Sequence, residues 1–385
     1  MKRLLRILLF IPIIGFSQYT SIPDQNFEQA LIDLGYDNAV DGQVLTVNIN
    51  GVSFLNVSSK AISDLTGIED FTSLNELQCY SNQLTNLNVS QNTSLTHLYC
   101  NSNQLTNLDV SQNTSLTDLL CFSNQLTSLG VSQNTSLINL QCYSNQITNL
   151  DMSQNTALTT LNFYSNQLTS IDITQNIALT NLNTSNNQLT SLDVSQNTAL
   201  TSLHNAGNQL TNLDVSQNTS LTDLQCYSNQ ITNLDISQNT ALADLNCSSN
   251  QLTSLDLRNG NNQNLLNIAV FANTALTCIH VDDVTFSNNN WTSIDAQHYF
   301  STNCTNSVQE IPSSISIYPN PTNNLFQIEI ESYNGRFEAE LYDFTGKLLK
   351  TSNNTTLSLA DYPIGIYLLK VAYGDRVEQF KVVKE

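Results

Sequence analysis

Leucines along most of the chain follow one pattern that repeats every 21 residues. In residues 105–125, LTNLDVSQNTSLTDLLCFSNQ, the motif LxxLxVxxN is followed by LxxLxCxxN, so the same half-motif occurs twice in each repeat. The alternation Leu-x-Val or Leu-x-Cys is typical of a short strand with one buried face. The pattern therefore predicts two short strands per repeat.

The repeats stay in register over a long distance. The tripeptide Asn-Gln-Leu or Asn-Gln-Ile recurs every 21 residues, with its last residue at positions 84, 105, 126, 147, 168, 189, 210, 231 and 252. Self-similarity at this period indicates a solenoid in which each repeat forms one coil. The Asn that ends each half-motif is expected to close the turn, because its amide tolerates the left-handed conformation and bonds nearby backbone. We expect a slim, weakly curved prism with two parallel sheets.

Six cysteines share one inward position of the repeat: Cys79, Cys100, Cys121, Cys142, Cys226 and Cys247. Phe163, Thr184 and Asn205 fill the same position in the intervening repeats. One interpretation is a ladder of free thiols packed as small hydrophobic groups. The other is disulfides between coils, which an oxidising compartment favours. Parallel Cβ vectors hold neighbouring Cβ atoms too far apart for a bond, and this favours free thiols.

These motifs resemble the nested 21-residue leucine-rich repeats of secreted bacterial proteins. The resemblance covers about residues 45–257, and we assign residues 62–257 to the solenoid. It implies a mainly β fold and a non-catalytic binding scaffold.

The N-terminal segment has two predicted parts. Residues 1–18 have a basic start, an apolar run and a small-residue cleavage site, which predict a secretory signal peptide; an uncleaved anchor is the other interpretation. Residues 19–61 are expected to cap the first coil with a helix that places Phe27, Leu31 and Leu34 on one face.

Residues 258–311 depart from the repeat and are expected to seal the last coil, since an open solenoid end exposes apolar side chains. Cys278 and Cys304 lie outside the register of the other cysteines. We predict a disulfide between them that stabilises this C-terminal cap.

Residues 312–385 have a different pattern of short alternating β runs separated by turn residues, which predicts an Ig-like antiparallel β-sandwich. The segments YPNPT, LYDFTGK and YPIGIYLLKV occur in this order. They resemble the C-terminal sorting domain of the type IX secretion system of Bacteroidetes. The motif residues are Tyr318, Pro319, Asn320, Pro321, Gly346, Gly365 and Tyr367. The resemblance implies export by that machinery, with the domain retained or removed afterwards, although Glu385 stands where a terminal Lys is usual.

Charge narrows the range of partners. The chain has a net charge of -20, and no Lys or Arg occurs between Lys60 and Arg258. A polyanionic surface repels phosphate groups, so the sequence excludes nucleic acid as a partner. No apolar run after the signal peptide is long enough to span a membrane, so we expect no transmembrane segment in the mature protein.

No sequence motif predicts catalysis. Nucleophile, zinc-protease and phosphate-loop motifs are absent from the sequence, and its four histidines do not form metal-binding pairs. We therefore assign no catalytic residue and no cofactor. Asp282, Asp283 and Asp295, near Trp291 and His298, leave a glycan hydrolase as a remote alternative.

The position after each ladder cysteine forms an outward column that is rich in aromatic residues. The candidate ligand-binding residues are Tyr80, Phe122, Tyr143, Tyr164 and Tyr227. Rings with a polar tip suit sugar faces or protein partners. Alternatively, contacts between the rings of neighbouring strands only stabilise the sheet.

A second outward column is rich in aspartate: Asp151, Asp172, Asp193, Asp214, Asp235 and Asp256. Carboxylates about 4.8 Å apart repel one another. Calcium between the coils would relieve this repulsion. Hydrogen bonds from the N–H groups of the following turn are the other interpretation.

Together these features predict a non-catalytic recognition or adhesion protein, secreted or held at the outer-membrane cell surface. Its rigid solenoid is expected to bind an extracellular protein or polysaccharide, and its C-terminal domain to engage the secretion machinery. The alternative is a structural spacer without a specific ligand.

Overall fold

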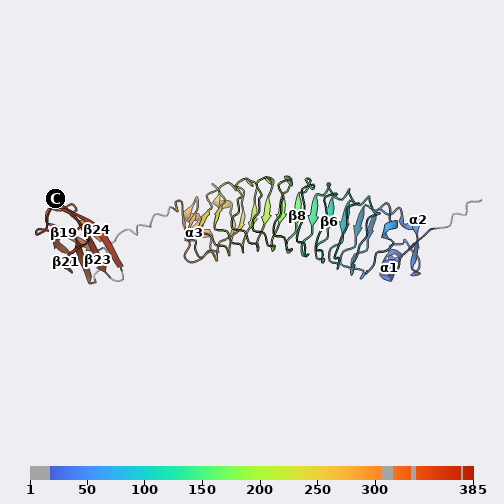
Figure 1. The fold of residues 1–385 in the computed structure, drawn as a ribbon, viewed down its shortest axis with the longest axis horizontal. Coiled ribbons are helices and arrows are strands. Elements are labelled where there is room, and N and C mark those ends of the chain that lie inside the picture. Colours follow the sequence, from blue (N-terminus) through green and yellow to red (C-terminus); the bar gives the residue numbers. More distant parts are fainter. Residues whose placement is uncertain (1–17, 305–314, 331–334, 374–375) are drawn as a thin grey trace, which may run out of the picture. The chain divides into compact units, whose positions relative to one another are not determined.

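The computed structural model describes residues 18–304, 315–330, 335–373 and 376–385. The chain divides into two compact units, Met1–Cys304 and Thr305–Glu385. The first unit is a gently bent solenoid of stacked coils (Figure 1). The predicted signal peptide falls almost entirely within residues 1–17, outside the described residues, and stays a prediction.

One side of the solenoid is an 11-stranded parallel sheet, called the main sheet below. Its three-residue strands are β3 (Phe54–Asn56), β4 (Glu76–Gln78), β5 (His97–Tyr99), β6 (Asp118–Leu120), β7 (Asn139–Gln141), β8 (Thr160–Asn162), β9 (Asn181–Asn183), β10 (Ser202–His204), β11 (Asp223–Gln225), β13 (Asp244–Asn246) and β15 (Asn267–Ala269). The middle residue of each strand is buried, and pairs such as Leu98 with Leu119 lie one repeat apart. This confirms that 21 residues make one coil.

Buried asparagines connect neighbouring coils at the end of each main-sheet strand. Asn103 Nδ2 donates to the carbonyls of Cys79 (3.0 Å) and Cys100 (3.1 Å), while its Oδ1 accepts the N–H of Leu84 (3.0 Å). The equivalent asparagines from Asn82 to Asn250 make the same kind of bonds. Because both ends of the amide are used, each asparagine fixes the spacing between two coils.

The left-handed residue of this turn is the one before the asparagine, which corrects the expectation that the asparagine itself adopts that conformation. Ser102, for example, has φ +56, and serines at the same position in other repeats have nearly the same value. The asparagine side chain instead supplies hydrogen bonds to the turn. The two residues have different roles in the turn. The serine adopts the left-handed backbone conformation, and the asparagine amide is held by three hydrogen bonds.

The opposite side of the solenoid is less regular than predicted. Its four-stranded parallel sheet contains β12 (Asn233–Asp235), β14 (Ser254–Asp256), β16 (Cys278–His280) and β17 (Tyr299–Ser301). Earlier coils show only isolated bridges, such as Asn88 to Asp109. The N–H of Thr148 lies 3.4 Å from the carbonyl of Thr127, a long bond compared with those of the main sheet. On this side, turns within each coil replace many of the bonds between coils.

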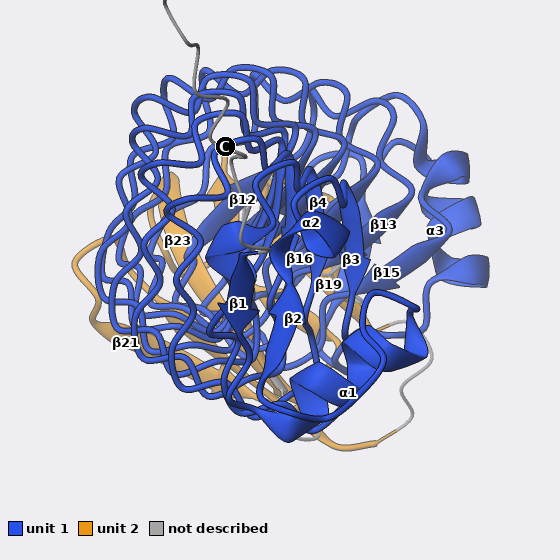
Figure 2. Cartoon of the chain, turned by 90° about the vertical axis from the view of Figure 1, so that its right-hand side faces the viewer, with its two compact units in different colours: residues 1–304 blue, residues 305–385 orange. Residues whose placement is uncertain are grey.

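The N-terminal end is covered by β1 (Tyr19–Ser21), α1 (Gln25–Asp33), β2 (Gln43–Leu45) and α2 (Thr46–Ile49), with η1 (Ile68–Asp70) in the first coil (Figure 2). Asp24 caps α1 by accepting the N–H groups of Asn26 and Phe27. Phe27 and Leu31 are buried as predicted, but Leu34 is 45% exposed. The helix ends at Asp33, so Leu34 lies beyond the buried face.

The C-terminal cap contains η2 (Asn262–Asn264) and α3 (Val284–Asn290). Trp291 is buried, contacts Phe286 and Phe300 edge-on, and donates its Nε1–H to the carbonyl of Leu265 (3.1 Å). The predicted disulfide between Cys278 and Cys304 is present, with Cα atoms 5.7 Å apart. This cap covers the apolar end of the last coil.

The second unit has two antiparallel sheets. One contains β18 (Ile315–Tyr318), β19 (Leu325–Ile330) and β22 (Thr356–Ser358), and the other β20 (Phe337–Tyr342), β21 (Leu348–Ser352), β23 (Gly365–Tyr373) and β24 (Arg376–Lys384). Buried residues from both sheets, including Phe326, Leu341 and Leu369, form a single core. This confirms the predicted antiparallel sandwich.

Candidate functional site

Three of the predicted ligand-binding aromatics form a continuous stack on the main sheet. The rings of Phe122 and Tyr143 lie 4.2 Å apart at 9°, and those of Tyr143 and Tyr164 lie 4.5 Å apart at 14°. Tyr143 therefore has a ring on each face and offers only its edge to a ligand. In the described part of the chain, Tyr164 has a ring on one face only, so its other face remains open.

The other two candidates stand apart from this stack. Asn101 separates Tyr80 from Phe122. Ser185 and Ala206 occupy the two repeats between Tyr164 and Tyr227. Tyr227 is 40% exposed. The structure thus brings three candidates together and leaves a gap in the column before the fifth.

The gap is an open hollow of about 390 Å³, called the tyrosine hollow below. Its lining residues are Tyr164, Asn183, Ser185, Asn186, His204, Gln225 and Tyr227. The two tyrosines lie at opposite ends of four successive repeats. The small side chain of Ser185 and the buried side chain of Ala206 leave the space between them open.

Asp223 fixes two polar residues of the tyrosine hollow. Its Oδ2 lies 2.6 Å from Nε2 of His204, and its Oδ1 accepts a hydrogen bond from Nε2 of Gln225 (2.7 Å). His204 and Asp223 lie in adjacent coils. Of the seven lining residues, only Tyr164 and Tyr227 were predicted as site residues from the sequence; Asn183, Ser185, Asn186, His204 and Gln225 were not. A signal was present, because the aromatic column is interrupted at Ser185 and Ala206.

The aspartate column lies on the opposite side of the solenoid, and its members are aligned where strands are present, as Asp235 with Asp256. Each aspartate accepts the N–H two residues later, as in Asp172 to Thr174 (3.0 Å) and Asp214 to Ser216 (2.9 Å). The hydrogen bonds from Ser216 hold the pKa of Asp214 below its ordinary value, although neighbouring Asp193 raises it. The turn bonds therefore outweigh the repulsion between carboxylates.

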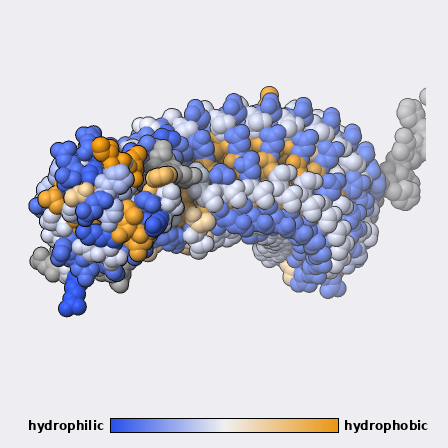
Figure 3. Space-filling model, turned by 60° about the vertical axis from the view of Figure 1, so that its left-hand side comes forward, coloured by the Kyte–Doolittle hydropathy of each residue, from blue (hydrophilic) through white to orange (hydrophobic). Residues whose placement is uncertain are grey.

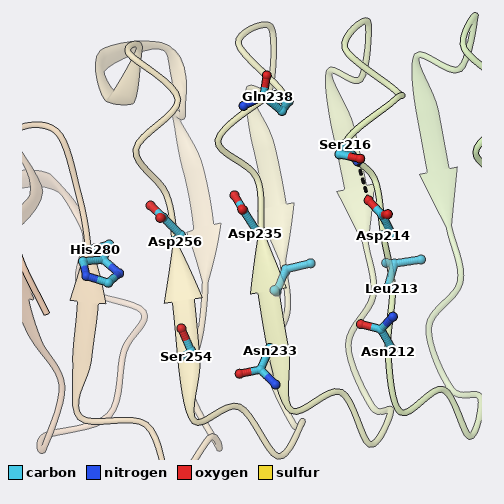
Figure 4. A pocket seen from close by; sticks show the side chains of 11 residues that line it. Asn212, Leu213, Asp214, Ser216, Asn233, Asp235, Gln238, Ser254, Asp256 and His280 are labelled. Carbon is cyan, nitrogen blue, oxygen red and sulfur yellow. Dashed lines mark hydrogen bonds between the residues drawn. The ribbon is translucent and has the colours of Figure 1, made fainter. Parts of the chain in front are cut away.

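Part of this column borders a second hollow of about 370 Å³, shown in Figure 4. Asp214, Asp235 and Asp256 line one side, with His280 beyond Asp256 (Figure 4). Arg258 forms an ion pair with Asp256 (2.6 Å). Among the described residues, no group of three His, Cys, Asp or Glu side chains is arranged to hold a metal ion. The turn bonds thus offset the repulsion between the carboxylates, and the calcium interpretation of the column stays a hypothesis.

The six ladder cysteines are all buried and free. Burial raises the pKa of Cys100, Cys142 and Cys226 to about 12. These thiols therefore pack as small hydrophobic groups, the interpretation that parallel Cβ vectors favoured.

The acidic residues of the C-terminal cap have structural partners. Asp283 caps α3 by accepting the N–H of Phe286 (2.9 Å), and Asp282 accepts the N–H of Gly260 (2.8 Å). Burial alone would raise the pKa of Asp295, but hydrogen bonds from the N–H groups of Ala272 and Asn273 bring it below its ordinary value. Asp295 is therefore ionised at neutral pH and poorly suited to act as a general acid.

The face of the solenoid seen in Figure 3 is largely hydrophilic. On the face seen in Figure 3, hydrophobic residues form a narrow band along the coils, between rows of hydrophilic residues. Among the described residues, no helix has both the length and the apolar character needed to cross a bilayer.

In the second unit, the motif around Asn320 holds the final strand. Asn320 Oδ1 accepts the N–H of Val383 (2.9 Å), and its Nδ2 donates to the carbonyl of Lys381 (2.7 Å). The N–H of Thr322 donates to the carbonyl of Val383 (2.8 Å). The peptide bonds before Pro319 and Pro321 are cis. Tyr318 ends β18 and is exposed.

The remaining motif residues shape the same sandwich. Gly346 has φ +85 in the turn between β20 and β21, where its N–H donates to the carbonyl of Asp343 (3.0 Å). Gly365 begins β23, and Tyr367 is buried with its hydroxyl donating to the carbonyl of Pro363. The motifs thus have structural roles in one domain.

Residues 316–385 match the family of secretion system C-terminal sorting domains. No curated protein matches the sequence.

Several solved structures are similar to the chain. A leucine-rich-repeat protein of Leptospira interrogans has 24% identity and a TM-score of 0.50, with 66% of this chain and 81% of that one covered. The leucine-rich-repeat ectodomain of the Arabidopsis thaliana receptor kinase GASSHO1/SCHENGEN3, solved with CASPARIAN STRIP INTEGRITY FACTOR 2, has 18% identity and a TM-score of 0.53, with 66% and 37% covered. The functional domain of InlJ from Listeria monocytogenes, described as including a cysteine ladder, has 26% identity and a TM-score of 0.43, with 96% and 99% covered.

The likenesses to the Leptospira interrogans and Arabidopsis thaliana structures show the fold, and the C-terminal match shows the route of export to the cell surface or beyond. The chain is a leucine-rich-repeat solenoid protein that carries a type IX secretion C-terminal sorting domain.

Proposed function

We propose that this exported solenoid is a non-catalytic recognition protein that binds an extracellular protein or polysaccharide through the outward face of the main sheet. The observation that carries the proposal is a contrast between two exposed surfaces of the same repeat. On one surface the side chains change from coil to coil, and on the other the same side chain recurs in every coil.

On the main sheet, the outward residues differ between neighbouring coils. The first residues of β5 to β11 are His97, Asp118, Asn139, Thr160, Asn181, Ser202 and Asp223. Away from this sheet, exposed threonine recurs in every repeat at residues 85, 106, 127, 148, 169, 190, 211, 232 and 253. A uniform column binds a ligand equally well at every coil, whereas a varied surface defines one position. The main sheet therefore has the chemistry that specific recognition requires.

A structural spacer is the second candidate, and the stacking of Phe122, Tyr143 and Tyr164 favours it. Rings that cover each other stabilise neighbouring strands without any ligand. In that case the length of the solenoid matters and its surface does not.

The two candidates are separated by binding of the full chain to extracellular polysaccharides and secreted proteins. One variant replaces Phe122, Tyr143 and Tyr164 by Ser. The control replaces Thr106, Thr127 and Thr148, from the same three repeats, by Ala. A recognition protein loses its ligand only in the aromatic variant. If the wild-type protein binds nothing, the spacer is favoured instead. If the aromatic variant binds a ligand as well as the wild type does, the aromatic stack is not the binding surface.

A further inference from the structure

We propose that the tyrosine hollow binds a neutral oligosaccharide. This inference rests on the proposed recognition function and adds a ligand class to it. The hollow joins two aromatic ends to a polar wall, and each part has a chemical consequence.

The two ends are tyrosine rings that stand far apart along the solenoid. One face of Tyr164 is covered by Tyr143, and the other is directed along the column toward Ser185. Tyr227 follows three repeats later, a separation of about 14 Å at about 4.8 Å per coil. The apolar face of a tyrosine ring suits the C–H face of a sugar, and its hydroxyl stays hydrated. Two such faces at this distance suit a short oligosaccharide better than one monosaccharide.

The wall between the rings presents hydrogen-bonding atoms in fixed positions. The carboxylate of Asp223 is the hydrogen-bond partner of Nε2 of His204 and of Nε2 of Gln225. Nδ1 of His204 and the Oε1 acceptor of Gln225 can therefore bond a ligand. Asn183 Oδ1 accepts the N–H of Ser185 (3.0 Å), which leaves its Nδ2 donor. A sugar hydroxyl both donates and accepts, so a wall with both kinds of atom matches it. Side chains held by neighbours lose little entropy on binding.

The same lining disfavours other ligands. The carboxylate of Asp223 and the net charge of -20 repel phosphates and anionic polysaccharides. An apolar peptide anchor needs a dry pocket, whereas Asn183, Asn186 and Gln225 place polar side chains in this open lining. Neutral, hydroxyl-rich molecules remain the best fit.

The two coils beneath the hollow also depart from the repeat in the interior. Thr184 and Asn205 replace the ladder cysteine, and both are fully buried. The hydroxyl of Thr184 and both amide atoms of Asn205 have no hydrogen-bond partner in the protein. Local departures from stable packing are expected at functional sites. Here the interior and exterior departures fall on the same two coils.

The test is isothermal titration calorimetry on the purified full chain. The probes are cellohexaose, xylohexaose, laminarihexaose, maltohexaose and mannohexaose, with an oligogalacturonate as the anionic comparison. Ser185→Tyr continues the ring stack and fills the hollow while Asn183, His204 and Gln225 stay in place. Tyr227→Ser removes one end. Tyr299→Ser, an exposed tyrosine of the C-terminal cap, is the matched control.

We expect at least one neutral probe to bind. Ser185→Tyr and Tyr227→Ser should each weaken that binding by about tenfold or more, and Tyr299→Ser should not. The inference is overturned if no neutral probe binds, if only the oligogalacturonate binds, or if Ser185→Tyr, with an unchanged melting temperature, binds as tightly as the wild type. If a protein partner binds the main sheet and no glycan does, the recognition function stands and this inference fails.

Discussion

The side-chain amide of Asn186 occupies the space that a Cβ atom on Gly207 would need. The two residues hold the same turn position in adjacent coils, and Gly207 has φ +64. At the equivalent positions, Ser165 and Ser228 adopt φ +54 and +55. Because serine tolerates this conformation here, the backbone does not require the glycine. Gly207 instead makes room for Asn186, which lines the tyrosine hollow.

Restoring the repeat residue with Gly207→Ser should therefore displace Asn186. We expect the affinity for the oligosaccharide that the wild type binds to fall by about threefold to tenfold, with little change in melting temperature. Calorimetric titration and thermal unfolding measure the two quantities. Gly260→Ser is the control, because its Cβ would meet no atom within 4 Å. Unchanged affinity in Gly207→Ser would show that Asn186 has no part in binding.

Two buried asparagines of one repeat should respond to substitution in opposite ways. Both amide atoms of Asn205 lack a protein partner, so Asn205→Cys, which restores the ladder residue, should stabilise the solenoid by about 1–3 kcal/mol. Asn208 donates to the carbonyls of Thr184 and Asn205 and accepts the N–H of Leu189. Asn208→Ala should therefore destabilise it by about 1–3 kcal/mol. Urea unfolding compares the two variants. A loss of stability in Asn205→Cys would contradict the first expectation.

The coil register, the inward cysteines and the two outward columns could be predicted because each follows from a period of 21. The tyrosine hollow depends on departures from that period. It needs Ser185 and Ala206 to be small, and it needs Asp223 to reach His204 in the preceding coil. A pattern search records such positions as imperfect repeats. That these positions form one hollow becomes visible only in the structure, where the departing residues of neighbouring coils lie side by side.

The sequence also overstated the regularity of the second sheet. Both half-motifs predict a strand, but on the second side only β12, β14, β16 and β17 form a sheet. The N–H two residues after each aspartate bonds the carboxylate in coils without a strand, as Ser111 bonds Asp109, and in coils with one, as Ser237 bonds Asp235, so the residue pattern does not distinguish them. The position of the left-handed residue was missed for a similar reason. Ser102 and Asn103 are adjacent, and either residue type is common in turns.

The aspartate column should make stability depend on pH only in acid. Hydrogen bonds from the following residue hold the pKa of Asp109, Asp151, Asp172, Asp193 and Asp214 below the ordinary value of 3.8. A lowered folded-state pKa gives stability that is present above the unfolded value and is lost as pH falls through the folded one. The melting temperature should be level from neutral pH down to about 5 and fall below about 4.

Asp214→Asn should keep the turn bond, as Asn88 does with Ser90, and should reduce this acid sensitivity. Asp214→Ala loses the bond and should be less stable at neutral pH. Calcium should not raise the melting temperature of the wild type. A calcium-dependent rise that Asp214→Asn abolishes would restore the ion-binding interpretation of the column.

The ladder thiols should be unreactive while the solenoid is folded. Cys121 and its five equivalents are fully or almost fully buried, and burial raises the pKa of each thiol, to about 12 for Cys100. Reaction requires the thiolate and access to solvent. Ellman's reagent should therefore detect no thiol in the native protein and six after unfolding in guanidinium. Fewer than six would show that ladder disulfides had formed.

The last strand should depend on one side chain of the sorting motif. Asn320 makes two hydrogen bonds to β24, at Lys381 and Val383, and both are lost in Asn320→Ala. Two such bonds contribute about 1–3 kcal/mol, enough to loosen the chain end that this asparagine holds. Asn323→Ala, at an exposed position three residues after Asn320, is the control. We expect the first variant to accumulate inside the cell and the second to reach the surface or medium, as measured by fractionation and immunoblotting. Normal export of Asn320→Ala, together with a lower melting temperature of the C-terminal domain, would show that export does not depend on the hydrogen bonds that hold this strand.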